Sequence, residues 1–428
     1  MMKFARNALY GLQSSFRQVQ GNARIIVVMQ PFWAVANAMY NPYLSLYMKE
    51  VGCTDFQVGV INAISMVAGV VIGLFAGWIT DRLGRRLTNL IADSLCWAVP
   101  CVLWGLSHSF LWFAIAAVSN AFVRLISVSW NCTLTEDTPP ERRLTMFWWL
   151  NIINNAAIFA TPLMTLLIKP LGLESAMRWV LLPTAALYMT LFLIRFFISK
   201  ESTVGRERII TSRGTSPFTA VKDYVPLIKM VFTNPVLLTF LMIRSLYFVQ
   251  MGLKGVFLPI TLVGIQFDNS IIGTINWVSA IVMLLMQFVL LPRLKRLDTK
   301  TPLMVSLGAL LVSNVIIMLT PAHNMFVLML GTIVSAGGAI ITGMLVDTAT
   351  ANAMPDQQRA PLLALISLII VALSAPFQVL GGALAEVPGL GPRLPMLIIV
   401  VLFAACMVLL AANNRREKRA ALREQAAE

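Results

Sequence analysis

Charged residues are scarce in this 428-residue sequence. Asp, Glu, Lys and Arg together make up 12% of the residues, whereas hydrophobic residues make up 58%, and the mean hydropathy is +0.78. A soluble chain could not bury that much apolar surface, whereas a lipid bilayer accepts it as solvent. The composition therefore excludes an ordinary soluble domain and indicates a membrane protein.

The sequence also lacks the features of several chemistries. It has no Gly-Lys-Ser/Thr loop for phosphate, so we do not expect ATP hydrolysis. Its five cysteines show no metal-like pairing, and four of them lie in apolar runs, so we expect neither a metal site nor a disulfide framework. Residues 1–24 contain four basic residues, no acidic residue and no cleavable apolar core, so we expect no signal peptide. We predict no enzyme activity and no cofactor.

Acidic residues are outnumbered by basic ones, which gives a net charge of +14. Such an excess could indicate binding to nucleic acid. However, the basic residues form short clusters between apolar runs, which is the pattern of the positive-inside rule for membrane proteins. We therefore expect a lipid bilayer, and no nucleic acid, as the partner of these charges.

Apolar runs of spanning length, about 20 residues for a bilayer core of about 30 Å, follow one another along the chain. They lie near 25–48, 57–80, 87–107, 110–135, 145–168, 176–198, 235–263, 270–292, 302–320, 325–349, 360–385 and 394–412. The loops that are rich in Lys and Arg alternate with loops that are poor in them. The rich set, and both termini with it, should be cytoplasmic. The sequence thus predicts an all-α, multi-pass membrane protein of twelve transmembrane helices.

A charged stretch separates the second and third apolar runs. It reads Gly77-Trp-Ile-Thr-Asp81-Arg82-Leu-Gly84-Arg85-Arg86, and we call residues 77–86 the signature loop. It resembles the loop Gly-x-x-x-Asp-Arg-x-Gly-Arg-Arg/Lys of the major facilitator superfamily. A generic positive-inside loop would explain the arginines but not Asp81 and the two glycines. The resemblance implies two six-helix bundles with pseudo-two-fold symmetry, transport by alternating access, and a gating role for Gly77, Asp81, Arg82, Gly84 and Arg85.

The two halves of the chain echo each other. Pro139-Pro-Glu-Arg-Arg143 is matched by Pro355-Asp-Gln-Gln-Arg359, an offset of 355 − 139 = 216 residues, and Arg82 is matched by Arg296 at an offset of 214. These offsets favour a duplicated bundle. We predict a cytoplasmic N-terminal segment (1–24), a first bundle (25–198), a cytoplasmic linker (199–234) that is partly helical near 220–230, a second bundle (235–412) and a cytoplasmic tail (413–428).

A gating mechanism follows if the second and eleventh helices touch, as the resemblance suggests. Asp81 would then lie beside the start of the helix at 360–385, where unpaired amide groups favour a carboxylate. Arg85 could pair with Glu136 or Asp137 at the end of the helix at 110–135. The alternative is that these charges only anchor the loop at the lipid headgroups.

Polar residues inside the expected helices are the candidates for substrate binding. They are Gln30, Trp33, Asn37, Asn120, Arg124, Asn151, Asn155, Arg244, Tyr247, Lys254 and Asn276. In the superfamily that the chain resembles, the first, fourth, seventh and tenth helices line a central cavity. A single buried Asn more often joins two helices than binds a ligand, but an Arg in mid-membrane is costly and is usually functional or paired.

Carboxylates inside the spans are limited to Asp93 and Asp347, and we expect both near the cytoplasmic ends. Arg124, Arg244 and Lys254 therefore lack an evident counter-charge, which favours a substrate that carries negative charge or many acceptors. Backbone carbonyls, Asn side chains and snorkelling could equally satisfy these cations.

The sequence thus favours a secondary transporter in the plasma membrane for a small polar or anionic organic solute. Protons or a counter-transported anion could be coupled to it, and we expect a monomer. The alternative is a proton-coupled exporter of drugs and other amphiphiles, supported by Thr161-Pro162, which imitates an antiporter pattern without its Gly, and by the supply of aromatic residues and Met. A membrane receptor that transports nothing would make the charged gate unnecessary.

Overall fold

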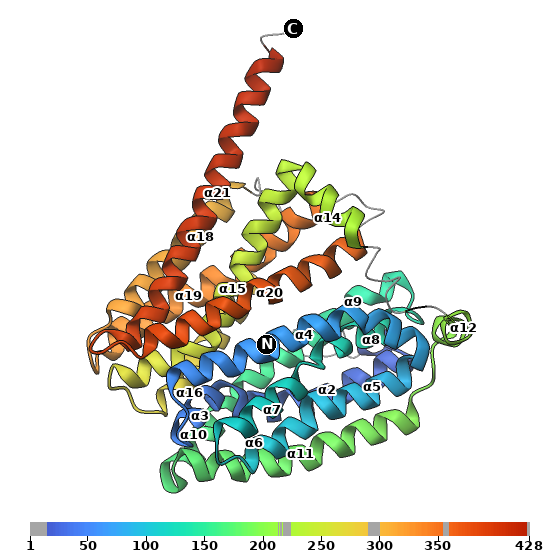
Figure 1. Ribbon diagram of the computed structural model, residues 1–428, viewed down its shortest axis with the longest axis horizontal. Helices are drawn as coiled ribbons and strands as arrows, with labels where there is room; N and C mark the ends of the chain where they lie inside the picture. Colours follow the sequence, from blue (N-terminus) through green and yellow to red (C-terminus); the bar gives the residue numbers. More distant parts are fainter. Residues whose placement is uncertain are drawn as a thin grey trace, which may run out of the picture. The chain divides into compact units, whose positions relative to one another are not determined.

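The computed structural model describes residues 15–212, 214, 216, 224–289, 300–353 and 359–425, and all regular structure in these ranges is helical. Figure 1 shows the helices in order along the chain. Ten helical segments of this described part are long and apolar enough to cross a membrane, and the helix at Ile271–Met286 is apolar but shorter.

The first half of the chain forms six spanning segments, several of them broken by short turns of another helix type. Their elements are α2 (Gly21–Tyr40), η1 (Asn41–Tyr43), α3 (Leu44–Glu50), α4 (Asp55–Leu83), α5 (Arg85–Asp93), η2 (Ser94–Ala98), α6 (Val99–Gly105), α7 (Phe110–Asn120), α8 (Val123–Thr135), α9 (Pro140–Ala157), η3 (Ile158–Ala160), α10 (Thr161–Leu171) and α11 (Leu173–Ile198).

The second half contributes a short polar helix, a connecting helix and six further segments. Its elements are α12 (Thr203–Thr211), α14 (Tyr224–Thr233), α15 (Pro235–Gly264), α16 (Ile271–Val289), α18 (Lys300–Leu319), α19 (Met325–Ala353), α20 (Arg359–Ala385), η5 (Gly391–Arg393) and α21 (Leu394–Gln425). Each predicted apolar run thus corresponds to one helical segment, and the prediction of twelve membrane helices is confirmed. The linker contains α12 and α14, while the expected helical start near residue 220 lies outside the described residues.

The contacts divide the chain into two compact units. Unit 1 comprises residues 1–41 and 68–221, and unit 2 comprises residues 42–67 and 222–428. The helix α4 is shared between them, because its first part, up to Val67, packs with the C-terminal half of the chain.

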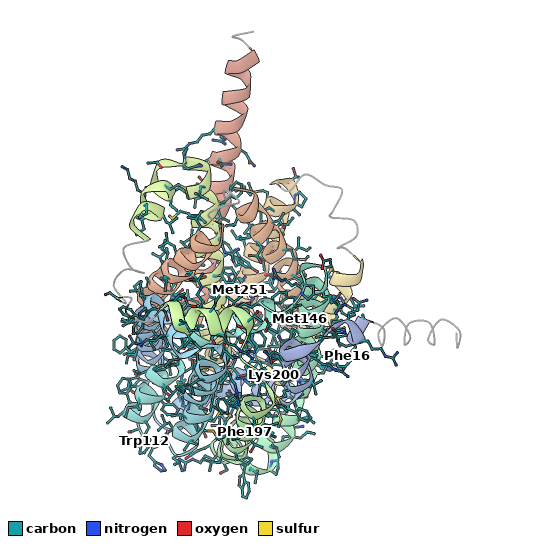
Figure 2. All side chains as sticks on the ribbon, turned by 90° about the vertical axis from the view of Figure 1, so that its right-hand side faces the viewer. Phe16, Trp112, Met146, Phe197, Lys200 and Met251 are labelled. Carbon is teal, nitrogen blue, oxygen red and sulfur yellow. The ribbon has the colours of Figure 1, made fainter. Side chains whose placement is uncertain are left out.

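Two apolar cores lie among the described residues of unit 1. One joins α2 to α8 and α9 through Ile26, Leu134 and Met146, and the other joins α4, α5 and η2 to α8 through Ala76, Ala92 and Leu125. Apolar side chains also cover the outer surface of this unit, where Phe197 is 74% exposed and Trp112 is 39% exposed (Figure 2). Burial inside and apolar exposure outside together fit helices that are surrounded by lipid.

Two helices of unit 2 cross at very short distance. A Cβ atom added at Gly59 of α4 would lie 2.4 Å from the backbone oxygen of Gln378 in α20, and one at Gly382 of α20 would lie 2.5 Å from the backbone oxygen of Asp55. Only glycine fits such a crossing, since any side chain would push the backbones apart. The expected contact between the second and eleventh helices is therefore present at the Asp55 end of α4.

A carboxylate fixes the same end of this crossing. Glu386, just beyond α20, accepts a hydrogen bond of 2.9 Å from the Phe56 N–H in the first turn of α4. Hydrogen bonds from the Thr54 side chain and from this N–H lower the pKa of Glu386. Lys49 forms an ion pair of 2.7 Å with Asp55, which adds a second charged contact at the same helix end.

Candidate functional site

Arg85 of the signature loop lies at the centre of a buried charge network in unit 1. Its side chain is 5% exposed, and its Nη2 lies 2.8 Å from Oε1 of Glu136, just beyond α8. Its Nη1 lies 3.0 Å from Oδ1 of Asp81 in the last turn of α4. One guanidinium thus joins the ends of three membrane helices, because a planar group with five N–H donors can serve several carboxylate oxygens.

The linker covers this network from the other side. Glu201 accepts the backbone N–H groups of Arg85 at 2.8 Å and of Arg86 at 2.9 Å, so its carboxylate caps the start of α5. The preceding Gly84 has φ +80°, and a Cβ atom there would lie 2.7 Å from Oε2 of Glu201. Gly84 is therefore required for both its backbone conformation and this close approach. Ser202 continues the contact by donating to Glu136 while capping α12.

The remaining predicted gating residues are less buried. Arg82 lies over the Trp78 ring at 5.2 Å, and Asp137 accepts a hydrogen bond of 2.8 Å from the Thr203 hydroxyl. Gly77 is exposed and has open space where a Cβ atom would lie. The proposed contact of Asp81 with the start of α20 joins residues of different units and stays a prediction.

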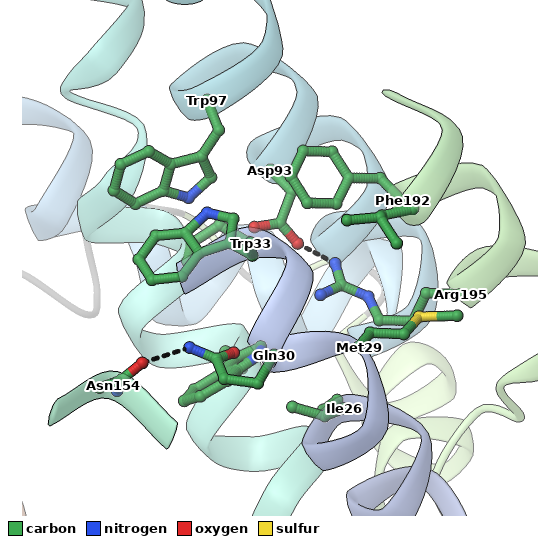
Figure 3. Close-up of a pocket in the computed structure, with 12 residues that line it drawn as sticks. Ile26, Met29, Gln30, Trp33, Asp93, Trp97, Asn154, Phe192 and Arg195 are labelled. Atoms are coloured by element: carbon green, nitrogen blue, oxygen red, sulfur yellow. Dashed lines mark hydrogen bonds and ion pairs between the residues drawn. The ribbon is translucent and has the colours of Figure 1, made fainter. Parts of the chain in front are cut away.

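A cavity of about 220 Å³ lies inside unit 1 (Figure 3). We call it the unit 1 cavity. Its lining comes from helices α2, α5, α8, α9 and α11 and from the turn η2. The lining residues are Ile26, Met29, Gln30, Trp33, Asp93, Trp97, Ile126, Trp130, Asn154, Leu191, Phe192 and Arg195. Apolar and aromatic side chains predominate, and a few convergent polar groups interrupt them, which is the usual composition of a small-molecule site.

The charged end of the cavity is an ion pair between Asp93 of α5 and Arg195 of α11. Their side chains are 6% and 12% exposed. The Phe192 ring, 5.4 Å from the guanidinium carbon, supports Arg195 through its π face. Asp93 is the ninth residue of a span that starts at Arg85, about 12 Å along that helix, whereas its partner Arg195 lies in the last turn of α11. The expectation that Asp93 lies near the cytoplasmic end stays a prediction.

The amide end of the cavity is formed by Gln30 and Asn154. Gln30 Nε2 donates to Asn154 Oδ1 at 2.8 Å and so ties α2 to α9. Between the two ends, the Trp33 and Trp97 rings meet edge to face with centroids 4.9 Å apart. Trp97 belongs to the π-helical turn η2, which directly follows Asp93. Such single π turns occur frequently at functional sites in α-helices.

The structure brings only two of the predicted substrate residues of unit 1, Gln30 and Trp33, into this cavity. Asn120 instead donates to the backbone oxygen of Cys96 at 2.8 Å, which is a helix–helix contact, and Asn151 donates to its own helix at Phe147. Asn37 and Asn155 do not line the cavity. Arg124 is half-buried, and within the described residues its side chain has neither an ion pair nor a hydrogen bond.

In unit 2, the predicted cations are better compensated than the sequence suggested. Arg244 forms an ion pair with Asp347 and lies over the Phe248 ring at 5.1 Å. The expectation that Arg244 lacks a counter-charge is therefore wrong. Lys254 donates to the Ser335 hydroxyl at 2.5 Å, and the Tyr247 hydroxyl donates to the Ala339 backbone oxygen at 3.0 Å. Asn276 is half-buried on α16.

Sequence reasoning missed several residues of the cavity, above all Asp93, Trp97, Asn154 and Arg195. Asp93 and Arg195 are 102 positions apart, so no spacing rule connects them. A usable signal was present nevertheless: two charges of opposite sign within apolar runs require each other as partners.

The comparisons with known proteins agree with this architecture. The family model described as Major Facilitator Superfamily matches residues 32–377. The uncharacterized MFS-type transporter YhjO of Bacillus subtilis (strain 168) is 30% identical over 137 residues, which are 32% of this chain and about a third (34%) of that protein's length. A mutant of the nucleoside transporter NupG superposes with a TM-score of 0.74 at 14% identity, over 92% of this chain and 99% of that one. A D-xylose-proton symporter superposes with a TM-score of 0.69 at 13% identity, over 90% and 96%. At such identities the two solved structures show the fold alone.

Proposed function

The chain belongs to the major facilitator superfamily, and from this premise we propose that it is a secondary transporter for a small polar or anionic organic solute. The family match confirms the resemblance to this superfamily, and the protein is a multi-pass membrane protein. Transport without enzyme chemistry of its own is part of the proposal. Transport by alternating access, the solute class and any coupling ion are parts of the proposal.

The observation that carries the proposal is the unit 1 cavity. It is smaller than the pockets of roughly 300–1,000 Å³ that hold drug-sized ligands, so it suits a small solute. Its polar groups, the Asp93–Arg195 pair and the Gln30–Asn154 pair, stand at different places around an aromatic centre. Polar groups that are fixed by partners can orient a solute without first having to be ordered.

The charge network of the signature loop supports the gating part of the proposal. Arg85 ties the ends of α4, α5 and α8 together with Asp81 and Glu136. Separating the partners of a buried ion pair is costly, because it leaves an uncompensated charge. We propose that this network holds one conformation of the carrier and that Gly77, Arg82, Gly84 and Asp137 position the loop around it.

The anionic form of the proposal now depends on fewer cations, because Arg244 is paired with Asp347. Arg124 and Lys254 remain the proposed contacts for negative charge, with Tyr247, Asn276, Asn37, Asn120, Asn151 and Asn155 as further polar candidates. Lys254 has a hydroxyl partner in Ser335, which satisfies one donor and leaves its charge without a described carboxylate. An arginine grips a carboxylate or phosphate through two hydrogen bonds, whereas a lysine acts as a point charge.

Uptake by purified protein in sealed lipid vesicles tests the proposal. A panel of labelled small metabolites (sugars, nucleosides, organic acids and amino acids) is offered with and without a proton gradient. We expect saturable uptake of at least one polar solute, and at least a tenfold higher KM in the variants Asn154→Leu and Trp33→Leu. Arg178→Gln removes an ion pair with Glu174 outside the cavity and serves as the matched control. Uptake that is unchanged by both cavity variants would refute this assignment of the site.

The aromatic lining favours one alternative, a proton-coupled exporter of amphiphilic drugs. Trp33, Trp97, Trp130 and Phe192 would suit a flat apolar molecule. The same vesicles distinguish the two functions if a lipophilic cation and a polar metabolite are compared. Transport of the cation alone, driven by a proton gradient and unaffected by Arg124→Ala, would replace the polar-solute proposal with the exporter.

We further propose a monomer in the plasma membrane with both termini cytoplasmic, as the distribution of basic residues predicts. In a background without native cysteines, the exposed positions Ser175 and Thr211 each receive a cysteine. A membrane-impermeant thiol reagent applied to intact cells should label the Ser175→Cys protein and not the Thr211→Cys protein. The reverse pattern would invert the orientation.

A further inference from the structure

We propose that the unit 1 cavity selects a zwitterion, a small solute that carries an anionic group and a cationic group on a largely apolar body. The proposal rests on the proposed transport function and names the substrate class for the same cavity. What carries it is the placement of a complete ion pair, rather than a single charge, in the wall of an otherwise uncharged and mainly apolar cavity.

The ion pair offers binding capacity of both signs. Among the described residues, the hydrogen bond between the two side chains uses only Nη2 of Arg195 and Oδ2 of Asp93. A guanidinium has five N–H donors and an ionised carboxylate has two oxygens with about four acceptor positions. Nη1 and Nε of Arg195 and Oδ1 of Asp93 therefore have capacity for a ligand, and both residues line the cavity.

Charge balance distinguishes the possible ligands. A solute with only a negative charge competes with Asp93 for Arg195 and adds a second anion beside Asp93 in a cavity with a mainly apolar lining. A solute with only a positive charge does the converse beside Arg195. Uncompensated charge is costly at such a site because both side chains of the pair are largely buried. A zwitterion can place its anionic group on Arg195 and its cationic group on Asp93, and the net charge of the site then stays the same.

The rest of the lining defines the body of the solute. Trp33, Trp97 and Trp130 supply large apolar faces, and Figure 3 shows the first two beside the ion pair. An ammonium group that binds Asp93 also comes close to π faces, which attract cations. The Gln30 and Asn154 amides already bind each other, so the far end of the cavity requires little further polarity from the ligand.

The position of the Asp93–Arg195 pair favours a role in binding a ligand, in addition to holding the helices together. Replacing a buried ion pair by packed apolar residues is often neutral or stabilising, so stability alone does not explain one. Another ion pair of unit 1, Arg178–Glu174, lies outside the cavity. Its two residues are one helical turn apart on α11, and their side chains are 29% and 46% exposed. The buried Arg85–Glu136 pair joins two helices but does not line the cavity, whereas Asp93 of α5 and Arg195 of α11 both lie in the cavity wall. The Arg178–Glu174 pair thus serves as a control for the loss of an ion pair of unit 1 outside the cavity.

Equilibrium binding to the purified full chain tests the proposal. The probes are three α-amino acids of different side chain (alanine, leucine and phenylalanine), each compared with its amide, which is only cationic, and its N-acetyl form, which is only anionic. The fluorescence of Trp33, Trp97 and Trp130 reports occupancy of this cavity, with Trp97→Phe as a check on the origin of the signal. We expect at least one amino acid to bind at least tenfold more tightly than both of its singly charged derivatives.

Variants of the pair complete the test. Asp93→Asn should bring the affinity for the amino acid down to that for its N-acetyl form, and Arg195→Gln should bring it down to that for its amide. The exchange Asp93→Arg with Arg195→Asp keeps a pair and covers the case in which single variants fail to fold, and it should retain a preference for the zwitterion. Arg178→Gln should leave all affinities unchanged.

If no amino acid exceeds its singly charged derivatives, or if the preference survives Asp93→Asn and Arg195→Gln, the zwitterion proposal is wrong. These outcomes are separate from failure of the transport function, which is judged by uptake into vesicles. A protein that transports a sugar or a plain anion would keep the transport proposal and overturn this one.

Discussion

Glu201 offers the sharpest test of the charge network, because it touches the signature loop only through backbone groups. Its carboxylate accepts the N–H groups of Arg85 and Arg86 at the start of α5. A hydrogen bond to a charged group contributes about 1.5–3 kcal/mol to stability. This figure already includes the attraction between the carboxylate and the helix dipole, so we add no separate contribution for the dipole. Since the two bonds share one carboxylate, we expect Glu201→Ala to cost about 2–3 kcal/mol of local stability. Glu201→Gln keeps an acceptor and should cost about 1 kcal/mol.

Hydrogen exchange followed by mass spectrometry measures this directly on peptides that cover residues 84–90. A loss of 1.4 kcal/mol corresponds to a tenfold change, so protection of these amides should fall about 30- to 140-fold in Glu201→Ala and about fivefold in Glu201→Gln. Glu207 is exposed on α12 and provides the matched control, since Glu207→Ala should leave this peptide unchanged. Unchanged protection in Glu201→Ala, or an equal loss in Glu207→Ala, would refute the assignment of Glu201 as the cap of α5.

Four further outcomes are expected. Asp81→Asn should slow transport in vesicles while leaving the KM nearly unchanged, because it weakens a conformation and not the cavity; a changed KM with an unchanged rate would contradict this. Gly59→Ala should lower the melting temperature by an amount equivalent to about 1–3 kcal/mol, whereas Gly255→Ala, which meets no atom within 4 Å, should not. Cys53 is 5% exposed and burial raises its pKa to about 11, so at pH 8 it should react with maleimide far more slowly than an exposed cysteine, and faster only as the pH rises. The pKa of Glu386 is lowered on folding, so its contribution to stability is present above the ordinary glutamate pKa and is lost as the pH falls through the pKa of the folded state. Amide protection at the start of α4 should therefore drop in that pH range. Glu386→Gln should remove this pH dependence.

The sequence predicts the helices well because the bilayer imposes one simple requirement, length in apolar residues, on every segment. The runs at 57–80 and 176–198 became α4 (Asp55–Leu83) and α11 (Leu173–Ile198), within about three residues at each end. The breaks inside segments were not predictable in this way. Hydropathy does not detect η2 (Ser94–Ala98) or η3 (Ile158–Ala160), although a proline follows each of them by two residues, Pro100 in α6 and Pro162 in α10.

The signature loop was predictable because its residues are neighbours in sequence, so that Arg85 and Asp81 lie one helical turn apart. Glu201 was not, because nothing local shows that a linker residue returns 116 positions to cap α5.

The site depends on contacts that no local pattern encodes. The choice among Asn151, Asn154 and Asn155 illustrates this: all three lie near one another on α9, and only the facing helix decides which one is used. That helix is α2, where Gln30 selects Asn154. The Asp93–Arg195 pair escaped sequence reasoning for a related reason, because the partner of Asp93 is 102 positions away on another helix.

The π-helical turn at Ser94–Ala98 makes the third membrane segment one residue longer than a continuous α-helix between the same ends would be. The added residue is accommodated within a single turn. The turn separates the flanking helices α5 and α6, and its extra residue determines which of its side chains points into the cavity. In this protein that side chain is Trp97. This segment can therefore alter what the cavity accepts by gaining or losing one residue, without repacking the helices on either side.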